Sequence, residues 1–160
     1  MAPGLDVLFC GINPGLMSAA RGHNFARRGN RFWPALHGAG FTPRLLAPEE
    51  DGELPRYGLG ITNVVDRASA GEHDLSDDEL RAGAQQVEEL VRRWQPRVLA
   101  VVGIGAYRTA WGRPKATVGL QPETVGGRPV WVLPNPSGRT AHYQLPDLIR
   151  LFGELREWLA

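Results

Sequence analysis

Residues 5–15 have the sequence LDVLFCGINPG, in which a short apolar run leads into a loop with two glycines and a proline. The apolar run, Leu5 to Cys10, predicts a buried strand, and the glycine–proline segment predicts a tight loop at its end. Similar apolar runs occupy residues 60–65, 98–102 and 130–133. Strands that are apolar throughout and alternate with helices are typical of a parallel sheet covered on both faces. We therefore predict an α/β fold, a three-layer sandwich with a mainly parallel central sheet flanked by helices.

The helices of this sandwich are predicted from apolar periodicity and from capping residues. The clearest helix spans residues 77–94, where Ser76 and Glu79 form a capping box and apolar residues recur along one face. The last helix is expected from residue 146 to about residue 159. Shorter helices are expected at residues 30–36, 43–54 and 104–111, and a small strand is expected near Thr124 in an otherwise loop-rich segment, 112–128.

The composition of the chain restricts its class. Its 160 residues, 42% hydrophobic and 22% charged, predict one globular domain over residues 1–160. The single cysteine, Cys10, excludes a disulfide scaffold, a cysteine-ligated zinc site and a four-cysteine iron–sulfur cluster. The four histidines show no metal-ligand spacing, and Arg108 stands where a dinucleotide fingerprint beginning at Gly103 would need its third glycine. We therefore expect neither a metal nor a cofactor.

The sequence also predicts where the protein is found. No apolar run approaches membrane-spanning length, and no charged-then-apolar leader opens the chain. We therefore expect no membrane partner and an intracellular, cytoplasmic protein.

Charged residues are segregated along the chain, although the net charge is only +1. Twelve of the 17 acidic residues lie between Glu49 and Glu89, whereas residues 7–48 and 90–122 contain none. Both acid-free segments carry arginines, so they can build a basic face that suits a polyanion. Charges that cluster in sequence also occur on ordinary solvated surfaces. The charge pattern alone therefore leaves nucleic-acid binding and a plain surface as equal alternatives.

Two of the predicted strands end in asparagine–proline loops, at residues 11–15 (GINPG) and 134–138 (PNPSG). Proline fixes the backbone and glycine permits close approach, so each asparagine can be held rigidly. In parallel sheets, ligands bind at the carboxyl ends of the strands, where these loops are expected. A side-chain amide is both donor and acceptor, so Asn13 and Asn135 could read the polar edge of a planar base. Alternatively, each asparagine only stabilises its own turn.

Four segments carry a resemblance to a known family: residues 9–19 (FCGINPGLMSA), 30–33 (NRFW), 64–67 (VVDR) and 132–138 (VLPNPSG). In this order and at this spacing they resemble the mismatch-specific uracil-DNA glycosylases, which are relatives of the thymine-DNA glycosylases. The resemblance implies a uracil-DNA glycosylase-like fold. It also implies cleavage of the N-glycosidic bond of a base flipped out of mismatched double-stranded DNA, a step of base-excision repair.

The resemblance implies roles for individual residues at the expected site. Asn13 matches the asparagine that positions the attacking water, and Phe25 matches the aromatic residue that stacks on the extruded base. Asn135 matches the asparagine that faces the nucleotide. The full set implied for binding the base and its nucleotide is Ile12, Gly15, Ser18, Phe25, Asn135 and Ser137.

A second set of residues is expected to contact the duplex. By resemblance, residues 138–140 occupy the place of the loop that enters the duplex and fills the gap left by the flipped base. Close bacterial relatives carry Gly-Leu-Ser-Arg there, whereas this chain has Gly-Arg-Thr-Ala, which affects the expected preference for the opposite base. Asn63 likewise stands where a relative carries lysine. The residues of the wedge loop are Gly138, Arg139 and Thr140, and the candidate phosphate contacts are Arg27, Arg28 and Arg31.

The residue types also limit the expected mechanism. A neutral carboxamide is a poor proton acceptor, so Asn13 is expected to orient water rather than to deprotonate it. Asp66, after a predicted strand, is a candidate auxiliary group that would support the cationic sugar; alternatively it pairs with Arg67 or caps a helix. Lys115 is the only lysine and lies outside the motifs, so we expect a monofunctional glycosylase that forms no Schiff base.

Two other functions stay open at this point: a non-catalytic DNA-binding module with the same fold, and a hydrolase of free nucleosides. In the favoured interpretation, the partner is double-stranded DNA that contains a mismatched or damaged pyrimidine. The protein would then be a monomer, associated with the nucleoid through this DNA.

Overall fold

A five-stranded sheet forms the centre of the molecule, and four of its strands run parallel. The structure, a computed structural model of the chain, describes residues 3–13, 15–69, 74–137 and 142–160. The strands follow the order β2-β1-β3-β5-β4, and β4 is antiparallel to β5. The carboxyl ends of the parallel strands therefore lie along one edge. The strands are β1 (Val7–Gly11), β2 (Leu59–Asn63), β3 (Val98–Val102), β4 (Gly119–Val125) and β5 (Arg128–Leu133).

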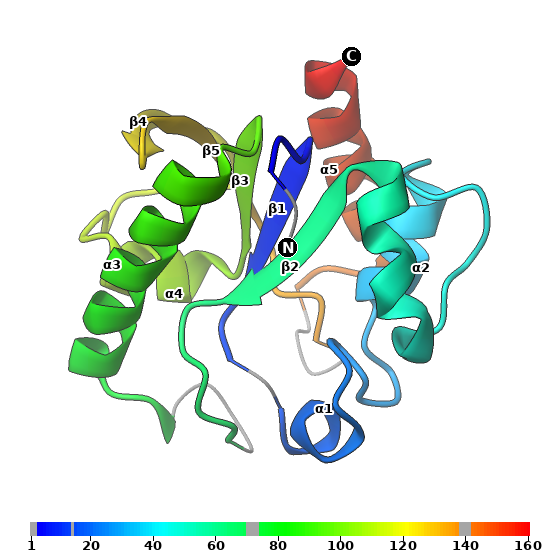
Figure 1. Cartoon of the computed structure of the whole chain (residues 1–160), viewed down its shortest axis with the longest axis horizontal. Coiled ribbons are helices and arrows are strands. Elements are labelled where there is room, and N and C mark those ends of the chain that lie inside the picture. Colours follow the sequence, from blue (N-terminus) through cyan, green and yellow to red (C-terminus); the bar gives the residue numbers. More distant parts are fainter. Residues whose placement is uncertain (1–2, 14, 70–73, 138–141) are drawn as a thin grey trace.

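Helices cover both faces of this sheet (Figure 1). On one face, α3 packs with α4; on the other, α2 packs with α5. The expected three-layer α/β fold with a mainly parallel sheet is thereby confirmed. None of the helices in the described part of the chain is long and apolar enough to cross a membrane. The helices are α1 (Leu16–Arg21), α2 (Phe32–Gly38), the 3-10 helix η1 (Pro48–Tyr57), α3 (Asp77–Trp94), α4 (Ile104–Ala110) and α5 (Leu145–Leu159).

Alternate residues of each central strand belong to two separate apolar cores. In β1, Val7 and Phe9 pack into the core under α2 and α5, whereas Leu8 and Cys10 pack into the core under α3 and α4. Every residue of β1 and of β3 is buried. Because both faces of these strands are covered, their sequences are continuous apolar runs rather than alternating ones.

The bounds of the longest elements agree closely with the prediction. Helix α3 and strand β3 have the expected limits, and Ser76 caps α3 by accepting a hydrogen bond from the Glu79 amide at 3.1 Å. Helix α5 starts one residue earlier than expected. The short helix expected at residues 43–54 is instead η1, which is shifted to Pro48–Tyr57.

Two elements were not predicted correctly. The expectation of a mostly loop-like segment over residues 112–128 is wrong in its second half, where the seven-residue strand β4 pairs with β5. Gly126 and Gly127 both have positive φ angles and join the two strands, a two-residue glycine turn that the sequence did contain. Helix α1 was missed because it has only six residues and no side chain caps its start.

Candidate active site

Asn13 lies in the loop after β1, and the segment after β2 holds its side chain in one orientation. The β1–β2 ladder continues past both strands, because the Val65 amide donates to the Ile12 carbonyl at 2.9 Å. Beyond it, the Asn13 Nδ2 group donates to the Arg67 carbonyl and to the Ser69 hydroxyl, each at 2.8 Å. Two acceptors on one nitrogen fix which end of the amide points inward.

The other end of this amide has an unused acceptor. Within the described residues, no protein group donates to Oδ1 of Asn13. The residue is half-buried, and its unpartnered oxygen is not among the buried polar atoms of the described residues, so this oxygen remains accessible. A carbonyl oxygen in a fixed direction can hold a water molecule by accepting one of its protons. The alternative in which Asn13 only stabilises its own turn therefore does not describe this side chain, because its nitrogen binds Arg67 and Ser69 in the segment after β2.

Phe25 lies beside the end of β1. Its ring is stacked on Phe32, with centroids 4.2 Å apart and planes 20° apart. A Cβ atom placed on Gly11 would lie 3.3 Å from Cζ of Phe25 and 2.6 Å from Oδ1 of Asn63. Gly11 therefore leaves the space in which the aromatic ring and the Asn63 amide approach the backbone of β1. Phe25 and Asn63 therefore both lie beside Gly11, which precedes Asn13 by two residues in the chain.

The backbone of Phe25 is strained and is held on both sides. Its φ angle of 51° lies in the left-handed region that residues other than glycine seldom adopt. On one side the Asn24 amide donates to Asp51 of η1 at 3.1 Å. On the other side the Ala26 amide donates to Oγ of Ser18 at 2.9 Å. Such a conformation persists only where the surrounding structure holds it, so these contacts position the aromatic ring.

Ser18 and Asp51 therefore act on the loop of Phe25. Ser18 is 8% exposed, and its hydroxyl is bound to the Ala26 amide, so it supports the loop from α1. Asp51 also contacts Nδ1 of His23 at 3.3 Å. The sequence reasoning did not single out Asp51, because a carboxylate in an acidic segment carries no sign of the distant loop that it binds.

The second asparagine–proline loop forms a local turn. Oδ1 of Asn135 accepts a hydrogen bond from the Ser137 amide at 2.9 Å, which is the turn-stabilising alternative for this residue. Asn13 and Asn135 both follow strands that end at the same edge of the sheet, with β3 between them. A role of Asn135, Ile12, Gly15 or Ser137 in binding the nucleotide stays a prediction.

Arg31 joins this second loop to the loop of Phe25. Its backbone amide donates to the Pro136 carbonyl at 2.9 Å, and its guanidinium donates to the Ser137 carbonyl at 2.7 Å. The guanidinium also donates to the carbonyl of Tyr143. A planar fork of donors suits several carbonyls at once. The structure thus places Arg31 as a clamp between backbone segments, and its expected phosphate contact stays a prediction.

Asp66 is exposed, and Arg67 turns away from it. The Arg67 guanidinium contacts the Glu79 carboxylate at 3.0 Å and the Asp74 carbonyl at 3.0 Å. The alternative in which Asp66 pairs with Arg67 is therefore wrong, because Glu79 at the start of α3 takes that place. The Glu79 pKa falls to about 2, because it accepts hydrogen bonds from Arg67 and from the Ser76 amide.

The expected duplex contacts are exposed or lie outside the described residues. Arg27 and Arg28 are exposed, and neither side chain forms a hydrogen bond or ion pair with another described residue. The wedge loop (Gly138, Arg139 and Thr140) lies outside the described residues. Within residues 3–13, 15–69, 74–137 and 142–160, no group of three or more His, Cys, Asp or Glu side chains is arranged to hold a metal ion.

The thiol of Cys10 is buried and is not accessible to solvent or substrate. It lies in the middle of the sheet and is fully buried, and this burial raises the pKa of its thiol to about 12. A thiol with such a pKa carries almost no thiolate near neutral pH, so Cys10 is no nucleophile here.

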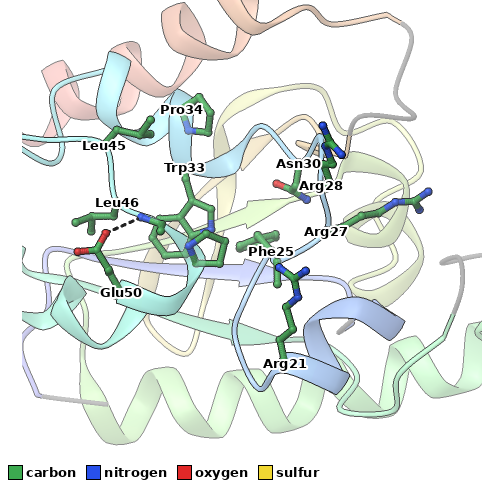
Figure 2. A pocket seen from close by; sticks show the side chains of 13 residues that line it. Arg21, Phe25, Arg27, Arg28, Asn30, Trp33, Pro34, Leu45, Leu46 and Glu50 are labelled. Atoms are coloured by element: carbon green, nitrogen blue, oxygen red, sulfur yellow. Dashed lines mark hydrogen bonds between the residues drawn. The ribbon is translucent and has the colours of Figure 1, made fainter.

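A pocket of about 490 Å³ lies on the α2 side of Phe25. Figure 2 shows it between the loop of residues 25–30, the start of α2 and residues 45–50. Its wall is largely apolar, with arginines on the side of α1 and of the Phe25 loop. This volume falls in the range of roughly 300–1,000 Å³ that small-molecule sites occupy.

The comparison with known protein families agrees with this arrangement. The family model described as "Uracil DNA glycosylase superfamily" matches residues 1–160, the full length of the chain. The match therefore includes both asparagine–proline loops, the Phe25 loop and the sheet that carries them. With a five-stranded, mainly parallel sheet between helices and a family match from end to end, this chain belongs to the uracil DNA glycosylase superfamily.

Proposed function

We propose that this protein is a monofunctional, monomeric uracil-DNA glycosylase that acts on mismatched duplexes in base-excision repair. It would extrude uracil, especially uracil opposite guanine, hydrolyse the N-glycosidic bond and leave an abasic site. Extrusion costs a few kcal/mol and is cheapest at a mismatch, so the pairing state itself contributes to selection. Family membership supports a DNA substrate.

The observation that carries this proposal is that, among the described residues, only the nitrogen of the Asn13 side-chain amide is hydrogen-bonded, which leaves its oxygen available. Its nitrogen is tethered to Arg67 and Ser69, and its oxygen is unpaired within the described residues. Oriented in this way, the oxygen would hold the attacking water against the sugar carbon as positive charge develops on the sugar. A neutral amide takes up no proton, so most of the acceleration must come from positioning and from stabilising the departing base.

The extruded base would lie on the ring of Phe25 and be read by Asn63. Phe32 stacks behind Phe25 at 4.2 Å and stiffens it. The Asn63 side chain is half-buried beside Gly11, and no described residue bonds to its amide. An amide at this place can donate to O4 of uracil and accept from N3–H, whereas cytosine presents the opposite pattern. Asn63 would thus select uracil over cytosine by chemistry rather than by size.

Asp66 and the exposed arginines have secondary places in this proposal. The carboxylate of Asp66 would stabilise the cationic sugar electrostatically. Because Asp66 is exposed to solvent, screening keeps this effect small. Arg27 and Arg28 would bind phosphates, and residues 138–140 would fill the gap left by the base. The opposite-base preference would then depend on Arg139.

Single-turnover excision of uracil from labelled duplexes tests the mechanism. We expect Asn13→Ala to reduce the rate by about 10²–10³-fold, the usual cost of removing one preorganised hydrogen-bonding group at the reacting centre. Asn63→Ala is expected to slow uracil release while abasic-site binding is retained, and Asp66→Ala to have a small effect. An unchanged rate for Asn13→Ala would refute the assigned role of its amide.

The same assay separates the two other functions. A DNA-binding module would bind the mismatched duplex and release no free uracil. A nucleoside hydrolase would cleave deoxyuridine as efficiently as uracil in DNA. We expect release of uracil from duplex DNA, faster opposite guanine than opposite adenine, and no cleavage of the free nucleoside.

A further inference from the structure

The pocket beside Phe25 has an apolar part with a shape suited to a flat group. Its apolar lining includes Trp33 and Pro34 from the start of α2 and Leu45 from the segment before η1, and Figure 2 shows Leu45 beside Pro34. The indole nitrogen of Trp33 donates to the Asn24 carbonyl at 3.3 Å, and the residue is only 4% exposed, so Trp33 contributes little open surface. The accessible apolar part comes from Leu45 and from the half-buried Pro34 and Phe25. Leu45 is 54% exposed, which is unusual for a large apolar side chain in this molecule. The pocket thus keeps apolar surface open to solvent.

The rim of this pocket is cationic. The side chains of Arg27 and Arg28 are exposed and make no hydrogen bond or ion pair with any other described residue. Arg21 makes one long contact of 3.9 Å with Glu49, and both side chains are more than half exposed. The acid in the pocket lining, Glu50, pairs with Arg44 at 2.5 Å, and Arg44 also contacts Glu53 at 2.8 Å. Hydrogen bonds from Arg44 and from the Ala47 amide lower the Glu50 pKa to about 2. The rim therefore has a local excess of positive charge.

We propose that this pocket binds one unstacked nucleotide of single-stranded DNA. A nucleobase has a flat face that suits the apolar part, and its phosphates suit the arginine rim. Aromatic surface combined with a basic groove is the usual means of binding single strands without sequence preference. This inference rests on the proposed function, because that function places DNA next to the target base and so identifies the occupant of the pocket as DNA. Phe25 borders this pocket as well as the proposed base site, so the two sites are neighbours.

The apolar part of the pocket is not needed for binding a paired duplex. Phosphate contacts by Arg27 and Arg28 would be enough for a duplex that stays paired. The apolar part gains nothing unless a base leaves its stack. Binding of single strands that depends on both the apolar and the cationic residues is therefore the signature of the pocket.

The test measures binding of a fluorescent ten-residue oligothymidylate without uracil, by anisotropy over a series of salt concentrations. Leu45→Glu places a carboxylate at the apolar edge, and the double variant Arg27→Gln/Arg28→Gln removes the rim charge. The charge-matched control is Arg81→Gln/Arg150→Gln, since both arginines are exposed and pair only within their own helices, with Asp78 and Glu154. All the substituted side chains are exposed, so folding should be retained.

We expect Leu45→Glu to weaken oligothymidylate binding by about five- to a hundredfold, the range that loss of one stacked base produces. The arginine variant should also lower the salt slope by about 0.7 for each lost phosphate contact, whereas the control should bind nearly as wild type. Wild-type binding by Leu45→Glu would overturn the proposal. So would a loss of duplex binding, with single-strand binding intact, in the arginine variant.

Competition distinguishes the two sources of the same ligand chemistry. Displacement by millimolar thymidine monophosphate would support a pocket that accepts a free nucleotide. Displacement by oligonucleotides alone would support a pocket that needs the flanking strand. Because the probe contains no uracil, this test is independent of excision. If the wild-type protein fails to release uracil from DNA, the proposed function falls while the binding result stands.

Discussion

The position of the Phe25 ring depends on a few polar contacts to the residues on either side of it. Asp51 holds Asn24, Ser18 holds Ala26, and the strained backbone between them leaves the ring against Phe32. A carboxylate on η1 therefore determines where an aromatic ring from another segment stands. Loss of Asp51 should therefore change the rate of excision only by displacing the ring of Phe25.

A double-mutant cycle tests this dependence. We expect Asp51→Ala to slow single-turnover excision, because it removes a charge-assisted hydrogen bond of the kind worth about 1.5–3 kcal/mol. In a Phe25→Ala background the same change should add almost nothing, since the ring that it positions is gone. Asp51→Asn should restore part of the rate.

Glu49→Gln is the matched control for this cycle. Glu49 belongs to the same 3-10 helix but only approaches Arg21 at 3.9 Å, so its replacement should leave the rate almost unchanged. Fully additive losses in the Phe25→Ala background would show that Asp51 acts by another route. No effect of Phe25→Ala alone would instead count against the stacking role of the ring.

At the scale of elements, α3 lies unusually close to the segment after β2. A Cβ atom on Gly83, in the middle of this helix, would press on the carbonyl oxygen of Val64. Backbone cannot move aside as a flexible side chain can, so only glycine permits this approach. The approach keeps the residues that follow β2 next to the start of α3, where Arg67 and Glu79 meet.

Gly83→Ala should therefore destabilise the protein although alanine is the better helix former. We expect a loss of about 1–3 kcal/mol, typical of overpacking, in denaturant unfolding. Gly153→Ala in α5 is the control, because nothing lies within 4 Å of the place that the alanine methyl group would take. There we expect a gain of up to about 1 kcal/mol. Equal effects of the two changes would show that α3 can shift away from Val64.

The ion pair at the start of α3 should make stability depend on pH. The Glu79 pKa drops from its ordinary value of 4.5 to about 2 in the folded protein. A lowered pKa means that the stabilisation is complete above about pH 4.5 and is lost as the pH falls toward 2. Glu79→Gln should thus lower the Tm at pH 7, and the difference from wild type should narrow between pH 4.5 and 2. A difference that stays constant over this range would exclude the ionised carboxylate as its source.

The sequence predicted those elements whose signals are strong and local. Helix α3 has a capping box and a long apolar face, and β3 is a continuous apolar run. Strand β4 was largely missed because it lies at the edge of the sheet, carries Pro122 and has a register shift between Leu120 and Thr124. These features disturb the period-two pattern that marks a strand.

At the scale of the whole molecule, the arginines of the acid-free segment 7–48 do not form a continuous basic face. Arg21 and Arg44 come from the acid-free segment 7–48, but they meet acids of η1, and Arg31 is bound to backbone carbonyls. Arg27 and Arg28 are left exposed. Folding thus concentrates the unpaired charge of this segment beside Phe25.

The sequence named candidate residues for the site but not the contacts that hold them. Asn13 lies in a family motif, Phe25 is a candidate through the resemblance alone, and the roles of both stay predictions. The structure places both beside the end of β1. Asp51, the pairing of Glu79 with Arg67 and the clamp role of Arg31 were missed, because each joins its residue to a different element or loop. Pairings of this kind depend on tertiary structure, and no local pattern encodes them.

The scarcity of amines in the chain gives the last prediction. Lys115 is the only lysine, and it is exposed on the segment between α4 and β4. A lyase step needs an amine that forms a Schiff base with the sugar. Borohydride treatment during uracil excision should therefore trap no covalent protein–DNA adduct. A trapped adduct that persists in Lys115→Arg would point to the amino terminus as the nucleophile.

The burial of Cys10 has a practical consequence for following this protein in solution. With its one thiol sealed inside the sheet, the folded chain should be almost inert to maleimides. A cysteine introduced at an exposed position outside the pocket lining, such as Met17, would be the sole reactive handle, without prior removal of the natural one. A dye or spin label attached there would report the arrival of a nucleic acid strand in real time.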